Sequence, residues 1–153
     1  ALLEDKLYFY SVRERWYENY YTMRGGVLDA LPYPAQVIVG LLAYRKISAF
    51  LYGQGTMRYT SEEIAAFRLE IWESVNALLV ASKQKGFEKD APFWVCGGAA
   101  PTNADTTVFG FVASAMVCDA GPASREVVKS FPVIVEYARR IHDTYYPDFA
   151  LWE

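Results

Sequence analysis

Residues 97–115, GGAAPTNADTTVFGFVASA, contain the transition that decides the fold: a turn with glycine and proline leads into a long apolar run. Thr102 is followed three residues later by Asp105, the spacing of an N-terminal capping box. We expect the Thr102 hydroxyl to accept from a free helix N–H and the Asp105 carboxylate to bond back to the cap N–H. Its charge also faces the positive helix end. The stretch therefore predicts a buried helix that starts at Thr102 and ends near Val117.

Two chemical alternatives for this stretch fail on residue type. A phosphate-binding P-loop needs a lysine and a Ser or Thr after its last glycine, and a strand before it, which GGAAPTN lacks. The glycines also do not match the dinucleotide-binding fingerprint. We therefore interpret Thr102 and Asp105 as structural residues that act on folding and have no catalytic role.

Helical periodicity extends along the rest of the chain, and no period-two alternation typical of strands competes with it. A second capping box, Thr60 with Glu63, opens the longest predicted helix. The expected helices cover approximately residues 1–21, 35–52, 61–85, 102–117, 124–129 and 132–145. Ser124 is expected to cap the short helix, and Pro132 to lie in the first turn of the last one. The sequence thus predicts an all-α fold, a five- to six-helix bundle in one domain over residues 1–153.

Several details of packing also follow from the pattern. The RGG at 24–26 and the LPYP at 31–34 are expected to break the chain. Gly40 inside a helix indicates a close helix approach, and the aromatic tail 146–153 is expected to pack back. The predicted buried face of the longest helix consists of Ile64, Phe67, Ile71, Val75, Leu78 and Leu79.

The composition restricts the class of protein. Apolar residues make up 53% and aromatic residues 16% of the 153 residues, so we expect some aromatic surface to face a partner or ligand. The net charge of −3 without a basic stripe argues against nucleic acid as a partner. The longest apolar stretch, AQVIVGLLAY, is too short for a transmembrane segment.

The cysteines and the histidine show no metal-ligand spacing, so no metal site is predicted. Cys118 is interpreted as a buried, inert thiol, whereas a reactive Cys96 remains an open alternative. Free thiols fit a reducing, cytoplasmic location. His142 beside Asp143 is interpreted as a surface residue, because sequence neighbours on a helix point apart.

Four stretches carry a family resemblance across nearly the whole chain. FWVCGGAAPTNADTTVFGFV resembles the segment that opens the core helix of the C-terminal domain in glutathione transferases. LLEDKLYFYSVRERWYEN is similar to the first helix of that domain in the branch that contains metaxins and failed-axon-connections proteins. LYGQGTMRYTSEEI and SFPVIVEYARRIHDTYYPDF resemble that branch's step into its long helix and its closing helix. The chain is thus similar to a glutathione transferase C-terminal helical domain.

This resemblance implies a division of labour. In the family, a preceding thioredoxin-like domain carries the glutathione site and the catalytic Ser, Tyr or Cys. Ala1 is already in helical register without an initiator Met, so we expect it to be a cut or boundary and the thioredoxin-like domain to be a partner. The resemblance implies glutathione as cofactor, bound mainly by that domain, and a hydrophobic electrophile as substrate. The chain alone would have no catalytic residue and no turnover.

The resemblance also implies a substrate site, because the first helices of this domain line the electrophile pocket in glutathione transferases. The residues that match are Tyr10, Arg13, Trp16, Tyr17 and Tyr20. An arginine could attract the anionic tripeptide, and tyrosine hydroxyls could orient an electrophile. A structural interpretation stays open, in which Trp16 and Tyr20 are core residues and Arg13 and Arg15 are solvated.

Two interaction hypotheses remain beside the enzymatic one. The stretch RERWYENYY has the aromatic and arginine composition of an interface core, which would suit a homodimer. The resemblance to metaxins implies a second possible function, a non-enzymatic protein-interaction or assembly module of the same fold.

Overall fold

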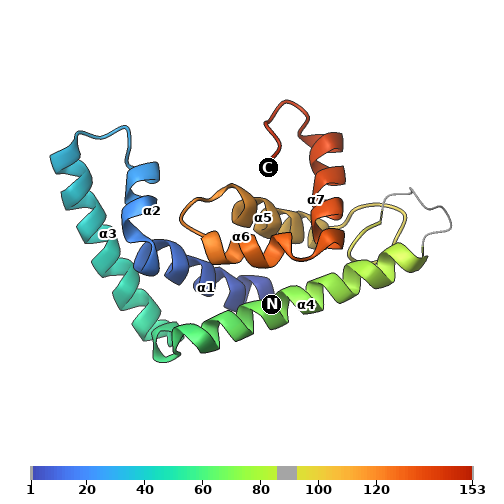
Figure 1. Cartoon of the computed structure of the whole chain (residues 1–153), viewed down its shortest axis with the longest axis horizontal. Coiled ribbons are helices and arrows are strands. Elements are labelled where there is room, and N and C mark those ends of the chain that lie inside the picture. Colours follow the sequence, from blue (N-terminus) through green and yellow to red (C-terminus); the bar gives the residue numbers. More distant parts are fainter. Residues whose placement is uncertain (1, 86–92, 153) are drawn as a thin grey trace. The chain divides into compact units, whose positions relative to one another are not determined.

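The computed structural model describes residues 2–85 and 93–152, which are drawn in colour in Figure 1. Within this part of the chain there are seven α-helices and no strand, so the all-α prediction is confirmed. The expectation about Ala1 and part of the predicted connection, residues 86–92, lie outside the described residues.

The first predicted helix is interrupted, which makes the number of helices larger than the five to six expected. A π-helical segment, Leu3–Leu7, leads into α1 (Tyr8–Arg13) and a second π-helical segment, Glu14–Glu18. Asn19 then leaves helical geometry, with φ −114° and ψ 39°, and α2 (Tyr20–Val27) follows. The sequence pattern did not separate these two helices, because apolar residues continue at helical spacing across Asn19.

The predicted break at residues 24–26 was wrong, because Gly25 and Gly26 lie inside α2. Glycine in a helix costs about 1 kcal/mol relative to alanine, so a helix that contains two glycines needs support from its surroundings. Arg24 provides such support: its guanidinium carbon lies 5.6–5.7 Å from the ring centroids of Tyr20, Tyr21 and Tyr33.

The later helices lie close to their predicted bounds. They are α3 (Tyr33–Gln54), α4 (Ser61–Lys85), α5 (Asn103–Val117), α6 (Pro122–Lys129) and α7 (Pro132–Tyr145). Pro132 occupies the first turn of α7, as expected. Ser124 does not cap α6, because that helix already starts at Pro122, whose fixed φ suits a first helical turn. None of the described helices is long and apolar enough to cross a membrane by itself.

The chain forms two compact units. Unit 1 contains the described residues up to Arg68 together with Asp119–Pro122, and unit 2 contains Leu69–Cys118 and the residues from Ala123 onward. Helix α4 therefore begins in unit 1 and continues in unit 2.

In unit 1, α2 and α3 are antiparallel neighbours (Figure 1). A Cβ added at Gly40 would lie 2.7–2.8 Å from side-chain carbons of Arg24 and 2.8 Å from the Tyr20 hydroxyl. These distances are shorter than a side chain tolerates, so the close approach predicted at Gly40 is confirmed. Leu7, Leu51 and Ile64 are buried residues of the same unit.

In unit 2, the buried residues come from the later part of α4, from Phe93 and Trp94 in the connection before α5, and from α5 to α7. Ile71, Val75 and Leu79 are buried as predicted, but Leu78 is 55% exposed. At this turn of α4 the core lies on the side of Leu79, and Leu78 is turned from it by about 100°. Trp72, which follows Ile71 in α4, is also buried, although the sequence pattern did not predict it as a core residue.

Candidate functional site

The capping box at the start of α5 is built around the Asp105 carboxylate. The N–H of Thr102 donates to Asp105 Oδ2 at 2.7 Å, and the Thr102 hydroxyl donates to the same oxygen at 2.9 Å. Thr102 itself is exposed, whereas Asp105 is only 2% exposed. The start of the helix is thus buried on the side of the carboxylate and open on the side of Thr102, which corrects the expectation of a buried Thr102.

Asp105 also binds two groups outside the capping box. Its Oδ1 accepts from the N–H of Val95 at 2.8 Å and from the hydroxyl of Tyr137 at 2.9 Å. Val95 belongs to the connection before α5, and Tyr137 belongs to α7. One carboxylate therefore joins three segments of unit 2.

The protonation states of Asp105 and Tyr137 follow from these bonds. Burial raises the pKa of the Asp105 carboxyl, but the bonds from Val95, Thr102 and Tyr137 outweigh it and hold that pKa below its ordinary value. Burial, followed by the hydrogen bond to Asp105 and its negative charge, raises the pKa of Tyr137 far above its ordinary value. Asp105 is therefore an anion at neutral pH, and Tyr137 is a permanent donor to it.

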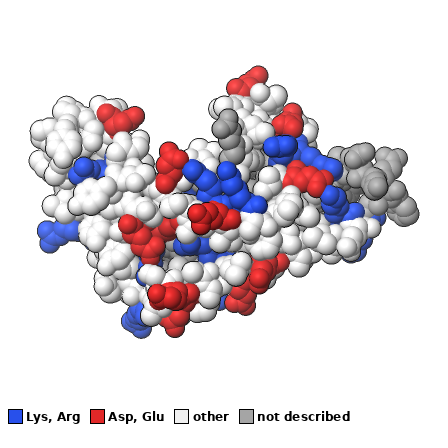
Figure 2. All heavy atoms as spheres, viewed as in Figure 1, with Lys and Arg blue, Asp and Glu red and all other residues white. Residues whose placement is uncertain are grey.

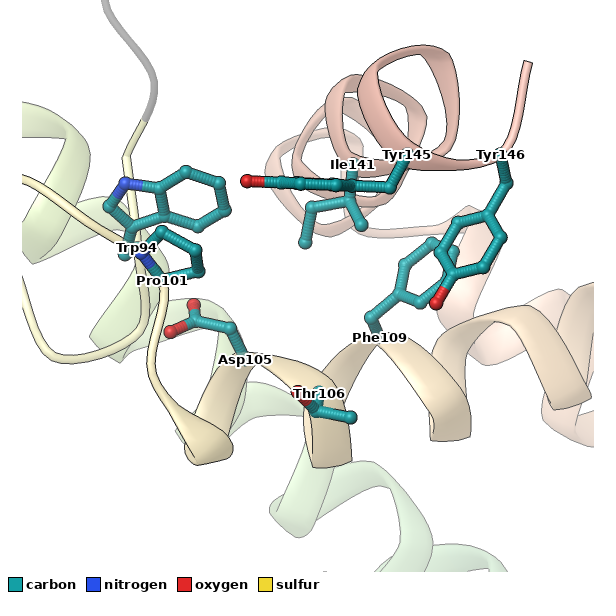
Figure 3. A pocket seen from close by; sticks show the side chains of 8 residues that line it. All are labelled: Trp94, Pro101, Asp105, Thr106, Phe109, Ile141, Tyr145 and Tyr146. Carbon is teal, nitrogen blue, oxygen red and sulfur yellow. The ribbon is translucent and has the colours of Figure 1, made fainter.

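A cavity of about 390 Å³ lies beside this carboxylate in unit 2, and its walls are mainly aromatic. We call it the aromatic pocket; it is lined by Trp94, Pro101, Asp105, Thr106, Phe109, Ile141, Tyr145 and Tyr146 (Figure 3). In Figure 3, Tyr145 extends across the pocket with its hydroxyl toward Trp94, while Phe109 and Tyr146 border the opposite side. Asp105 projects from α5 toward Pro101 and Trp94.

The aromatic tail packs back on α5 and α7, as predicted, and shapes one end of the pocket. The rings of Phe109 and Tyr146 stack with centroids 5.4 Å apart and planes inclined by 7°. Trp152 contacts the Phe109 ring, with centroids 6.2 Å apart. The tail thereby holds the two rings that form this wall.

His142 is part of the same arrangement, and its prediction as a surface residue was wrong. The side chain is 8% exposed, its Nε2 lies 3.0 Å from the backbone oxygen of Phe149, and its ring meets Trp152. Nδ1 lies 3.1 Å from Asp143 Oδ1, so these sequence neighbours do interact. The sequence argument failed because the tail covers this face of α7.

The predicted substrate residues lie in unit 1, where Arg13 has a structural environment. Arg13 is 6% exposed; its Nε binds Glu18 at 3.0 Å and its Nη1 donates to the backbone oxygens of Thr56 and Tyr59 at 3.2 and 2.8 Å. Its Nη2 donates to the Ser61 hydroxyl at 3.2 Å. The interpretation of Arg13 as solvated was therefore wrong, and these bonds tie the first helix to the segment that precedes α4.

The aromatic members of the predicted site divide between two places. Tyr10 is buried and stacks on Phe67, with centroids 6.2 Å apart. Tyr17 and Tyr20 instead contact the Tyr44 ring of α3, at 5.7 and 5.2 Å.

Trp16, the remaining predicted substrate residue, is half-buried. A second cavity, of about 480 Å³, is lined by Asp5, Lys6, Tyr10, Gln54, Gly55, Thr56, Arg58 and Tyr59. Of the five predicted residues, Tyr10 alone is among this lining.

The remaining candidates are the cysteines. Both are free thiols; Cys96 is exposed, and Cys118 is half-buried rather than buried. The Thr102 hydroxyl lies 3.8 Å from Cys96 Sγ, so this thiol is close to the capping box. Among the described residues, no group of three or more His, Cys, Asp or Glu could hold a metal ion.

Sequence reasoning found Asp105 but not the aromatic pocket beside it. The available signal was a cluster of aromatic residues: Tyr145 ends a helix that was predicted to pack in the same domain as α5, and Tyr146 and Trp152 lie in the tail that follows it. The pocket depends on which turn of α5 the tail meets, and periodicity does not specify this.

Comparison with known proteins gave no match: no family model, no curated protein and no solved structure matches this chain.

Proposed function

We propose that this chain is a helical small-molecule-binding domain of a glutathione transferase-like protein, and that the aromatic pocket of unit 2 receives a hydrophobic ligand. The sequence resemblance supports the family, and the aromatic pocket is the observation that carries the binding role. Its volume of about 390 Å³ is in the range of small-molecule sites, which combine apolar walls with a few polar groups. Here the polar groups are the hydroxyls of Thr106, Tyr145 and Tyr146 and the Asp105 carboxylate.

The proposed role is binding and not catalysis by this chain. Asp105 uses its carboxylate to accept four hydrogen bonds within the protein, so it is not available as a general base. In the proposal, glutathione and the group that activates it belong to the thioredoxin-like domain. The helical domain contributes the pocket for an electrophilic substrate.

A neutral fluorescent probe tests the binding role. N-phenyl-1-naphthylamine should bind the chain and be displaced by small apolar molecules. Tyr145→Ala should weaken this binding, because Tyr145 extends across the pocket. Tyr8→Ala is the matched control, since Tyr8 is 49% exposed, close to Tyr145 at 54%, lies in unit 1 and lines neither of the two cavities. Equal binding by both variants, or no binding of the probe at all, would contradict the proposal.

The chain's lack of catalysis is tested with glutathione and 1-chloro-2,4-dinitrobenzene. The chain alone should give no turnover above the uncatalysed reaction. Fusion to a thioredoxin-like domain that holds a glutathione site should produce it. Turnover by the chain alone at about 1 s⁻¹ or faster, the usual range of enzymes, would overturn the assignment of roles.

A second candidate function, a metaxin-like interaction module, is favoured by the surface of α2 and α3. Large apolar side chains with exposures of 38–67% lie there: Val27, Leu31, Tyr33, Ile38, Val39, Leu41, Leu42, Phe50 and Tyr52. Figure 2 shows few charged side chains over this part of unit 1, at the upper left. Extended apolar surfaces of this kind mark sites that another protein covers.

The oligomeric state tests whether this surface of α2 and α3 joins two copies of the chain. If the surface joins two copies, sedimentation should show a dimer that Leu42→Lys converts to a monomer. A monomer whose probe binding depends on Tyr145 would instead favour the small-molecule role.

A further inference from the structure

We propose that the aromatic pocket selects an organic cation, specifically a quaternary ammonium head group on a small apolar body. This inference rests on the proposed function, because it assumes that the pocket binds a small molecule. It adds the charge and the chemical class of the ligand.

In the part of the chain that the structure describes, the charge of Asp105 is not compensated by a cationic side chain. Its side chain is an anion at 2% exposure, and its four hydrogen-bond donors are neutral backbone and hydroxyl groups. Within residues 2–85 and 93–152, no cationic side chain forms an ion pair with it. The helix end of α5 offsets about half of one charge. Asp105, which lines the pocket, therefore brings to it a negative charge without an ion-pair partner among the described residues, although buried charges in proteins are usually paired.

The aromatic rings of the pocket also favour a cationic ligand. Trp94, Phe109, Tyr145 and Tyr146 border the same cavity that Asp105 lines (Figure 3). The faces of aromatic rings carry negative potential, and several rings around one cavity attract a cation within about 6 Å of their centroids. A ring face that meets the cavity thus favours the same sign of ligand charge as the carboxylate, whereas an anionic ligand would be repelled by the carboxylate.

The hydrogen bonds of the Asp105 carboxylate indicate the kind of cation. Asp105 Oδ1 accepts from Val95 and Tyr137, and Oδ2 accepts twice from Thr102, so the usual four acceptor positions of a carboxylate are occupied. A primary ammonium brings three N–H donors, which lose their water on entry and find no free carboxylate acceptor. A quaternary ammonium has no N–H to satisfy, and its methyl groups suit apolar walls. The carboxylate therefore offers a ligand its charge but no free hydrogen-bond acceptor.

The test compares choline with 3,3-dimethylbutan-1-ol, which has the same shape and a carbon atom in place of the charged nitrogen. Isothermal titration calorimetry on the full chain should show that choline binds about tenfold more tightly. Choline should also displace N-phenyl-1-naphthylamine. Equal affinity of the two compounds, or tighter binding of the anion 3,3-dimethylbutyrate, would overturn the inference.

A variant pair locates the effect. Tyr145→Leu keeps an apolar side chain but removes one ring, so choline affinity should fall several-fold while the affinity for 3,3-dimethylbutan-1-ol changes little. Tyr8→Leu should leave both affinities unchanged. Equal losses for the charged and the neutral compound in Tyr145→Leu would contradict a role of the ring face. Circular dichroism of each variant first establishes that it is folded.

The outcomes distinguish this inference from the proposed function. If the neutral probe binds at the pocket but choline does not displace it, the cation inference fails and the proposed function stands. If neither the probe nor choline binds, both fail.

Discussion

The two capping boxes of this protein have nearly the same sequence pattern but different surroundings. At the start of α4, Glu63 Oε2 accepts from the N–H of Thr60 at 2.8 Å, and Thr60 Oγ1 accepts from the N–H of Glu63 at 3.2 Å, with both residues exposed. At the start of α5, Asp105 makes the corresponding bond to Thr102 but also holds Val95 and Tyr137. The first box is local, whereas the second joins three segments.

A capping motif therefore predicts where a helix begins, but it does not predict how much of the protein's stability depends on that cap. An exposed cap that is lost can be replaced by water, so its contribution stays near 1 kcal/mol or below. A buried carboxylate that is lost leaves donors without partners, and each unsatisfied buried group costs about 1–3 kcal/mol. Substitutions in the two capping boxes distinguish the exposed cap from the buried one.

The largest effect is expected from Asp105→Ala. The change leaves the N–H of Val95 without its acceptor and leaves the Tyr137 hydroxyl the longer bond to the backbone oxygen of residue 105, at 3.3 Å. The free energy of unfolding should therefore fall by about 3 kcal/mol. Glu63→Ala is the matched control and should lower it by about 0.5–1 kcal/mol. Urea denaturation of both variants measures the difference. Equal losses would mean that the burial of Asp105 adds nothing to the local cap.

A smaller effect is expected from acid. The pKa of Asp105 is lower in the folded chain than in the unfolded chain, where an aspartate has a pKa of about 3.9. The unfolded state therefore binds more protons in this range, so stability rises with pH there. The contribution of Asp105 is fully present above the unfolded pKa and is lost as pH falls through the folded one.

Urea denaturation between pH 3 and pH 7 (roughly the range that brackets an aspartate pKa) should show this loss. Asp105→Asn should have a flatter profile at the acid end than the unchanged chain, because it has no carboxyl group to titrate. Parallel profiles would show that Asp105 has the same pKa in both states.

Tyr137→Phe should lower the free energy of unfolding by about 1–2 kcal/mol, because it removes one hydrogen bond to a charged group and keeps the ring. Its effect should be much smaller in an Asp105→Ala background, since the two residues share the bond between the hydroxyl and the side-chain oxygen. Additive effects in this double-mutant cycle would contradict the coupling between α5 and α7.

Thr102→Ala is expected to have the smallest effect within this box, about 1 kcal/mol, because Thr102 is exposed and Asp105 keeps its other donors. Together with Asp105→Ala, the cost should be less than the sum. Binding of the neutral probe per folded molecule should stay unchanged in Thr102→Ala. Normal stability with lost binding would instead make Thr102 a ligand-site residue.

The fold was predictable to the extent that it depends on local spacing. The bounds of α4, α5 and α7, both capping boxes and the close approach at Gly40 followed from residue types a few positions apart. The break at Asn19 did not, because nothing in the apolar pattern distinguishes it from the helix around it. Of the candidate site, Asp105 at the helix start was visible in advance, because it belongs to a capping box.

By itself, the sequence determined where helices begin and end in most of the chain, since a cap or a proline acts on backbone groups within one turn. Only the tertiary structure decided that Asp105 holds Tyr137, that His142 is covered by the tail, and that Arg13 is buried against the segment before α4. These contacts join residues from different elements. Their geometry depends on how whole helices and the tail pack, and a periodic pattern gives the face of a helix but not the residue that meets it.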